Sequence, residues 1–267
     1  MLERPARHFV ALDLETTGLL PESDRIVEIG AIRFDEHGQE LARFEQLVNP
    51  GRRMSPGAQA VHGISDADLA NAPPVESVLP AFLGFLGSTP EATFLAHNAS
   101  FDAAFLGFEI ARSGLVAPVS PIFDTLALAL RVRRDLSNHK LDTLARVLGL
   151  SSEGSHRALA DSIRVMGIWL QLGGPALALE DLTAYPMVGR SRSNAIPVGW
   201  EWLPQAIAGG QRIRMEYDGG RRIGSLREIT PRELVHRGGV AYLVAYCHLD
   251  AFEKSFRLDR VKRWELL

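Results

Sequence analysis

Apolar and β-branched residues form short runs along the first part of the chain, and polar turns separate these runs. Such runs predict β-strands, which we expect at residues 8–14, 26–34, 41–48 and 92–98. Apolar residues at helical spacing predict helices at residues 75–86, 100–113, 125–133, 140–149 and 157–172. Three strands, a helix, a strand and further helices indicate an α/β layer architecture.

The pattern changes within residues 173–200, where Gly, Pro, Ser and Asn interrupt the helical spacing. Beyond them, five alternating segments predict the strands of a small antiparallel β-barrel: "RIRMEYD", "RIGSLREIT", "ELVHRG", "VAYLVAYCHL" and "EKSFRLDRV". We therefore expect a first domain at residues 1–175, a linker at 176–199 with a short helix at 177–182, and a second domain at 200–267.

Charge divides the chain in the same way. Residues 1–189 carry 15 Lys and Arg against 23 Asp and Glu, a balance of −8, whereas residues 190–267 carry 14 against 9, a balance of +5. This asymmetry predicts two units with different partners. An acidic unit that approaches a polyanion would need bound cations, whereas a basic unit would not.

The composition is that of a globular protein, with 46% hydrophobic and 23% charged residues. No run of about 18 apolar residues predicts a membrane span, and the N-terminal residues do not resemble a secretion signal. The single cysteine, Cys247, cannot form an internal disulfide. We expect a cytoplasmic protein without a membrane partner.

Two carboxylates stand at the end of the first predicted strand, in the stretch "ALDLETTGLL". Asp13 and Glu15 are two positions apart, so their side chains should project from the same face. Like charges this close repel each other unless a cation lies between them. The alternative is a solvated strand end, where acidic residues are common.

Two later stretches add candidates for the same site. "HNASFD" (97–102) places Asp102 in the first turns of a predicted helix, and "HRALAD" (156–161) places His156 just before another helix that contains Asp161. His156 and Asp161 converge best if His156 lies in the loop before the helix. Carboxylates without cysteine or paired histidines favour Mg²⁺ or Mn²⁺ over zinc.

The ordered set "DLETTG", "HNASFD" and "HRALAD" resembles the three motifs of the DnaQ-like, or DEDDh, family of 3'→5' exonucleases, over roughly residues 8–172. The resemblance implies an RNase H-like fold with a mixed central sheet. It also implies two Mg²⁺ or Mn²⁺ ions and His156 as the general base. The implied metal ligands are Asp13, Glu15, Asp102 and Asp161. With two ions, we expect Asp13 to bridge both, Glu15 and Asp161 to bind the ion that holds the attacking water, and Asp102 to support the second.

The same resemblance implies a pocket for the 3'-terminal nucleotide, lined by Thr16, Thr17, Gly18, Asn98 and Phe101. Backbone N–H groups of a turn suit a hydroxyl or phosphate, and an aromatic ring suits a sugar or base. Phe101 could instead be a core aromatic. We interpret two further histidines as structural: His97 at a strand end and His62 in a loop.

Residues 203–267 resemble a WYL domain, a small SH3-like β-barrel, through Tyr217, Pro231, Tyr242-Leu243 and "FRLDRV". Ala241 replaces the tryptophan that gives the domain its name. The resemblance implies binding of nucleic acid or a nucleotide-like ligand, and we expect Tyr242, Arg257 and Arg260 to contact it. The alternative is a solvated strand with a local Asp259–Arg260 ion pair.

The leading hypothesis is a metal-dependent exonuclease that acts on single-stranded 3' ends of DNA or RNA and releases nucleoside monophosphates. The WYL-like domain would assist or regulate it. The alternatives are a non-catalytic sensor of nucleic acid or nucleotides, and a nuclease specific for RNA or short oligonucleotides. No clamp-binding or polymerase-tether signal is evident in the sequence.

Overall fold

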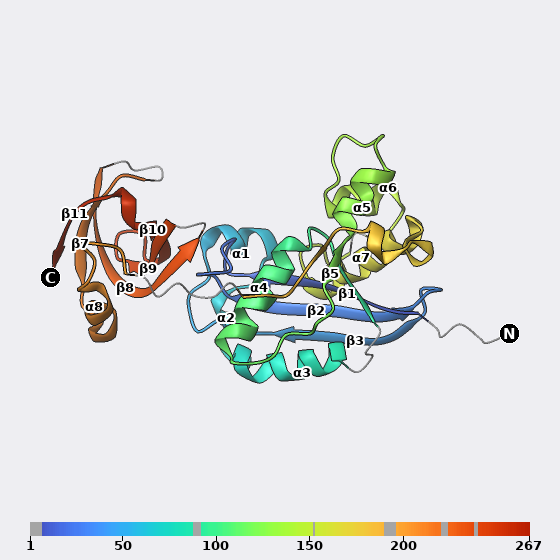
Figure 1. Cartoon of the computed structure of the whole chain (residues 1–267), viewed down its shortest axis with the longest axis horizontal. Helices are drawn as coiled ribbons and strands as arrows, with labels where there is room; N and C mark the ends of the chain where they lie inside the picture. The colour runs from blue at the N-terminus through green and yellow to red at the C-terminus, as the bar shows by residue number, and fades with distance from the viewer. Residues whose placement is uncertain (1–6, 88–91, 152, 190–195, 220–223, 238–239) are drawn as a thin grey trace. The chain divides into compact units, whose positions relative to one another are not determined.

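The computed structural model describes residues 7–87, 92–151, 153–189, 196–219, 224–237 and 240–267. They form two compact units (Figure 1). The first comprises Met1–Gly51 and Pro56–Arg190, and the second comprises Arg52–Ser55 and Ser191–Leu267.

The first unit is built on a six-stranded sheet in the order β3-β2-β1-β4-β5-β6 (Figure 1). Its strands are β1 (His8–Thr16), β2 (Ile26–Asp35), β3 (Glu40–Leu47), β4 (Thr93–Ala96), β5 (Ile122–Asp124) and β6 (Ala184–Tyr185). β1, β2 and β3 form an antiparallel meander, whereas β4 runs parallel to β1 and β5 runs parallel to β4. The sheet is therefore mixed, as predicted.

Helices cover both faces of this sheet. They are α1 (Pro56–His62), α2 (Asp66–Leu69), α3 (Val75–Gly87), α4 (Ser100–Arg112), α5 (Thr125–Val132), α6 (Leu141–Val147) and α7 (Ala158–Gln171). α3 and α4 pack on one face, and α5, α6 and α7 pack on the other. None of the helices in the described ranges is long and apolar enough to cross a membrane.

The alternation of β1 determines where its acidic residues lie. Val10 and Leu12 point into the core beneath α3 and α4, whereas Phe9 and Ala11 point into the core beneath α7. Because residues two apart share a face, Asp13 and Glu15 continue the row of Phe9 and Ala11. The fold therefore turns both carboxylates toward α7.

The segment predicted as a linker at residues 176–199 is partly built into the first unit. Two 3₁₀ turns, η1 (Gly174–Ala176) and η2 (Leu179–Asp181), lead into β6, which pairs with β5. The predicted helix at 177–182 is reduced to η2. The strand β6 was not predicted, because a two-residue strand leaves no periodic signal in the sequence.

The second unit contains α8 (Leu203–Gly209) and a five-stranded antiparallel sheet in the order β10-β9-β8-β7-β11. The strands are β7 (Ile213–Tyr217), β8 (Ser225–Arg237), β9 (Val240–Cys247), β10 (Phe252–Arg257) and β11 (Val261–Leu266), with a 3₁₀ turn, η3 (Leu258–Arg260), before β11. The described strand pairings do not include one between β10 and β11. The expected closure into an SH3-like barrel stays a prediction.

Two predicted segments of the second unit differ from the structure. "RIGSLREIT" and "ELVHRG" were expected as separate strands but join in β8, where the register shifts between Pro231 and Glu233. A bulge explains how proline, which lacks an N–H donor, is accommodated inside this strand. The strand expected through "FRLDRV" is interrupted by η3.

Candidate active site

Three carboxylates from distant parts of the chain converge at the end of β1. Ligand oxygens of Asp13, Glu15 and Asp161 all lie within 4.8 Å of one another. Asp13 and Glu15 come from β1, and Asp161 comes from the first turn of α7. The structure thus brings together three of the four predicted metal ligands in one cluster.

A close approach between α7 and β2 makes this convergence possible. Gly30 of β2 pairs with Asp13 of β1. A Cβ atom at Gly30 would lie 2.1 Å from the backbone of Ala158 and of Leu159, so only glycine fits there. The start of α7 therefore rests directly on the sheet, one turn before Asp161.

Asp102, the fourth predicted ligand, lies in the first turn of α4 and is 2% exposed. Its Oδ1 atom is buried and has no hydrogen-bond partner among the described residues. Burial is the largest cause that raises the pKa of Asp102, and the Glu15 charge raises it further; the Asp102 charge in turn adds to the rise in the pKa of Asp13 that burial causes. Asp102 therefore belongs to the same electrostatic cluster.

The cluster strongly disfavours its own ionisation. Burial is the largest cause that raises the pKa of Asp13, followed by repulsion from Asp102, Asp161 and Glu15. Burial and repulsion from Asp161 also raise the pKa of Glu15, from 4.5 to about 8. Burial raises the pKa of Asp161 and is partly offset by Arg164. Bound cations would remove this repulsion.

His156 lies in the loop before α7, as the spacing predicts, in the left-handed backbone region with φ of 63°. Its backbone N–H donates to Asp161 Oδ2 at 3.1 Å. Its imidazole is about half exposed, and Nε2 lies 3.8 Å from Asp142 Oδ2 at the start of α6. The ring can therefore reach water while a carboxylate stands beside it.

Two ion pairs with buried carboxylates support these residues, and sequence reasoning missed both. Glu28, fully buried on β2, accepts hydrogen bonds from the Arg157 side chain and from Ala158 N–H, and so holds the start of α7. Arg164, one turn further along α7, pairs with Asp161. The detectable signal was an acidic residue inside the apolar run "IVEIGAI", which is unusual unless the charge is paired.

The residues present fit divalent cations. All donors in the cluster are carboxylate oxygens, the ligands that Mg²⁺ and Mn²⁺ prefer. The orphaned Oδ1 atom of Asp102 and the mutual repulsion within the cluster both indicate missing positive charge.

The sequence model of the family described as "Exonuclease" (RNase_T) matches residues 10–168. The chain belongs to this exonuclease family. A "WYL domain" model matches residues 201–266. The predicted resemblance to DEDDh exonucleases followed by a WYL domain is therefore confirmed, and we call the two units the exonuclease domain and the WYL domain.

Among curated proteins, the chain is similar to "DNA polymerase III PolC-type" of Thermotoga maritima, with 40% identity over 154 residues, 58% of this chain and 11% of that protein. The protein of the same description from Bacillus cereus is 34% identical over 258 residues, 96% of this chain and 16% of that protein. The chain therefore spans only a small fraction of the length of these relatives.

Among solved structures, "Exonuclease X in complex with 5' overhanging duplex DNA" aligns with a TM-score of 0.50 and 27% identity, over 64% of this chain and 95% of that one. The nuclease domain of 3'hExo, described as "a DEDDh family member, bound to rAMP", aligns with a TM-score of 0.55 and 19% identity, over 67% of this chain and 96% of that one. The RNase H-like exonuclease fold with a mixed sheet is confirmed.

The turn that follows β1 in the exonuclease domain uses its polar groups internally. Thr16 donates to the carbonyl of Gly18, and Thr17 donates to Asp24 while accepting from Arg25 N–H. The Asp24 carboxylate occupies the space beside Gly18, where a Cβ would lie 2.4 Å from it. The absent side chain of Gly18 thus admits Asp24, and a substrate contact by this turn stays a prediction.

One exposed residue of this turn was not predicted. Leu19 is 79% exposed, a high value for a large apolar side chain.

His62, which was interpreted as structural, is buried beside this turn. It accepts from Ile64 N–H through Nδ1 and contacts the Thr16 carbonyl through Nε2 at 3.3 Å. Burial lowers the pKa of His62. His62 therefore supports the turn from within.

The second motif forms a sharp strand-to-helix turn. Asn98 is exposed and has a φ of 66°, and its backbone N–H donates to Asp124 Oδ1 at 3.0 Å. His97 contacts Thr125 and the carbonyl of His139, as a structural residue would. Phe101 is half-buried, and its ring centroid lies 4.7 Å from that of Phe105. It therefore packs against the core while part of it remains accessible.

In the WYL domain, one of the three predicted ligand residues, Arg257, has an internal ion-pair partner. Tyr242 and Arg257 are cross-strand neighbours, but the Arg257 guanidinium binds the Asp259 carboxylate at 2.6 and 3.0 Å. Arg260 is exposed at the end of η3. Asp259 thus forms a fork with Arg257 rather than the pair with Arg260 that was the alternative to ligand binding.

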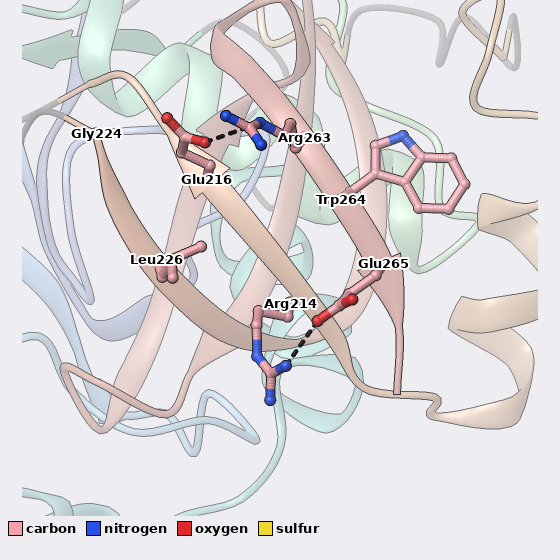
Figure 2. Close-up of a pocket in the computed structure, with 7 residues that line it drawn as sticks. All are labelled: Arg214, Glu216, Gly224, Leu226, Arg263, Trp264 and Glu265. Atoms are coloured by element: carbon pink, nitrogen blue, oxygen red, sulfur yellow. Dashed lines mark hydrogen bonds and ion pairs between the residues drawn. The ribbon is translucent and has the colours of Figure 1, made fainter.

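A pocket of about 600 Å³ lies elsewhere on the WYL sheet (Figure 2). It is lined by Arg214, Glu216, Gly224, Leu226, Arg263, Trp264 and Glu265, and by none of the three predicted ligand residues. Figure 2 shows Arg214 reaching Glu265 and Arg263 reaching Glu216, at 2.6 and 3.3 Å. Because these pairs neutralise both arginines, the pocket has no excess positive charge for an anion.

Proposed function

We propose that the exonuclease domain hydrolyses single-stranded DNA or RNA from the 3' end and releases nucleoside 5'-monophosphates, with two divalent cations held by Asp13, Glu15, Asp102 and Asp161. The observation that carries this proposal is the convergence of Asp13, Glu15 and Asp161 within 4.8 Å, together with Asp102, whose buried Oδ1 atom has no hydrogen-bond partner among the described residues. A cluster without bound cations would leave the repulsion among these carboxylates uncompensated.

When bound, the cations activate a water and stabilise the leaving oxygen of an in-line displacement at phosphorus. His156 accepts the proton of the attacking water through its accessible imidazole. Asp142, 3.8 Å from Nε2, stabilises the imidazolium that results. The backbone N–H of His156 donates to Asp161, and this hydrogen bond holds the general base close to the carboxylates that bind the cations.

The 3'-terminal nucleotide would lie between the turn after β1 and the start of α4. Leu19, exposed on that turn, offers an apolar surface for a base, and Phe101 offers the accessible part of its ring. Thr16, Thr17, Gly18 and Asn98 shape the backbone on either side. These contacts recognise a chain end by stacking, which tolerates any base.

For the C-terminal part, we propose that the WYL sheet completes an SH3-like barrel that binds nucleic acid or a nucleotide and assists the exonuclease domain. The division into an exonuclease domain, a connecting segment and a WYL domain beginning near residue 200 is part of this proposal. The basic balance of residues 190–267 supports it.

A time course on 5'-labelled single-stranded DNA, duplex DNA and RNA, with Mg²⁺ or Mn²⁺ and with a chelator, tests the activity. We expect a ladder that shortens from the 3' end, requires the metal and is absent for Asp13→Asn. Digestion from the 5' end would overturn the polarity. Binding of Mn²⁺ and oligonucleotide without cleavage would instead favour a non-catalytic sensor, and cleavage of RNA alone would favour an RNA-specific nuclease.

A further inference from the structure

Most basic side chains of the exonuclease domain are already engaged. Ion pairs join Arg25 and Arg112 to Glu109, Arg43 to Glu40, Arg133 to Asp135, Arg157 to Glu28 and Arg164 to Asp161. Arg7, Arg33 and Arg131 donate to backbone carbonyls. These cations are therefore neutralised or fixed within the fold.

Three cations differ from this pattern. The side chains of Arg134, Lys140 and Arg146 are exposed, and no hydrogen bond or ion pair engages them within the described ranges. All three belong to the connection between α5 and α6 or to α6 itself. In a domain region with a balance of −8, such a local concentration of unpaired positive charge is unusual.

This basic segment lies beside the candidate active site. His97, the first residue of the second motif, donates through Nε2 to the carbonyl of His139 at 2.8 Å and so fixes the residue before Lys140. Asp142, in the first turn of α6, stands 3.8 Å from the imidazole of His156. Arg146 is one helical turn after Asp142, so the two residues share a face of α6.

We propose that Arg134, Lys140 and Arg146 bind the phosphates of the substrate strand on the 5' side of the scissile linkage. This inference rests on the proposed function and deepens it, because it assigns a path to the strand beyond its terminal nucleotide. The carboxylate cluster repels a polyanion until cations are bound, and these three side chains attract the remaining strand without a metal.

Phosphate contacts predict a dependence on salt and on substrate length. Each contact to a single strand contributes about 0.7 to the slope of log affinity against log salt. Losing three contacts therefore lowers the slope by about 2, and from about 50 to 200 mM salt the wild type should lose about 20-fold more affinity than a variant without them.

The test is the triple variant Arg134→Gln, Lys140→Gln, Arg146→Gln in the full chain. Affinity for a labelled single strand of about a dozen nucleotides is measured as a function of salt, and kcat/KM is compared on that strand and on a dinucleotide. We expect the lower salt slope and a reduced ratio of kcat/KM on the strand to kcat/KM on the dinucleotide. The matched control is Arg43→Gln, because Arg43 is also exposed but is paired with Glu40. It is compared with the single variants Arg134→Gln, Lys140→Gln and Arg146→Gln, and it should leave the salt slope unchanged.

An unchanged slope and an unchanged ratio in the triple variant would overturn the assignment and leave the segment free for an acidic protein partner. Failure of the proposed function gives a different result. Suppose that the wild type cleaves neither substrate, and that the salt slope of strand affinity is lower in the triple variant than in the wild type. The phosphate-binding assignment would then be supported and the catalytic proposal would be wrong.

Discussion

The two domains treat charge in opposite ways. In the exonuclease domain, the carboxylates of Asp13, Glu15 and Asp161 lie close together, and their negative charge exceeds the positive charge of Arg164, which pairs with Asp161. A buried oxygen of Asp102 also has no hydrogen-bond partner among the described residues. In the WYL domain, arginines are matched by acids: Arg214 contacts Glu228 and Glu265, and Arg227 contacts Asp250.

The contrast indicates where each domain needs a ligand. A fold can accept like charges at close range only if something else compensates them, so the acidic cluster marks a site for cations. Arg214 and Arg227 are paired within the fold, so these two side chains by themselves mark no site.

The largest effect should come from neutralising the centre of the acidic cluster. Asp13→Asn should reduce exonuclease turnover below detection, because an amide cannot replace a carboxylate between two cations. The measurement is the rate of ladder formation on a 5'-labelled strand. The control is Glu36→Gln, which should keep the wild-type rate because Glu36 is an exposed carboxylate in the turn after β2. Near-normal turnover in Asp13→Asn would contradict the assignment of two cations to this cluster.

His156→Ala should lower kcat by about 10²–10⁴-fold with little change in substrate affinity, because a general base acts on the chemical step. Steady-state kinetics together with binding of an uncleaved strand separate the two quantities. A loss of affinity at unchanged kcat would make His156 a binding residue instead.

Glu28→Gln should lower activity by about 10–100-fold, the range typical of residues that orient metal ligands. Glu28 is fully buried and holds both Arg157 and the N–H of Ala158, so its loss allows α7 to shift relative to β1. The surface pair of Glu40 and Arg43 provides the control: Glu40→Gln removes an exposed Arg–Glu fork and should leave kcat unchanged.

Metal should stabilise the protein more strongly at high pH. Burial and repulsion raise the pKa of Glu15 from 4.5 to about 8, so between these values the folded state binds a proton that the unfolded state has released. Without metal, stability therefore falls as pH rises through this window. Mn²⁺ at about 100 times its Kd should add about 2.7 kcal/mol, or roughly 5–10 °C in Tm.

Thermal melts at pH 6 and pH 8, with and without Mn²⁺, measure this effect. Asp13→Asn should remove most of the increment due to metal. If Mn²⁺ raised Tm equally at pH 6 and pH 8, metal would not compete with protons for the carboxylates, which would contradict this prediction.

The smallest effect is expected in the WYL domain. Arg214→Ala should change the unfolding free energy little, because exposed ion pairs contribute little to stability, and should leave the salt dependence of nucleic-acid binding unchanged. Equilibrium unfolding and a salt titration measure both quantities. A large drop in the salt slope would show that Arg214 leaves its glutamate partners to bind phosphate. The paired arginines of the WYL domain would then mark a binding site after all.

The long elements were predicted well because the helices bury one apolar face and the central strands β1 and β2 form continuous apolar runs. β1, β2, β3 and helices α3, α4, α5, α6 and α7 all lie within a few residues of their expected positions. The short strands β5 and β6 and the helix α8 were missed because they are too short, or too rich in Pro and Gly, to show a period.

For the site, the sequence by itself determined the chemical types: four carboxylates and a histidine at the ends of strands and starts of helices. It could not determine their distances, because Asp13 and Asp161 are separated by most of the domain. Only the tertiary structure decided that Gly30 lets α7 rest on the sheet, that Glu28 holds Arg157, and that Asp24 occupies the space beside Gly18. Such contacts depend on packing between distant segments, which local pattern does not encode.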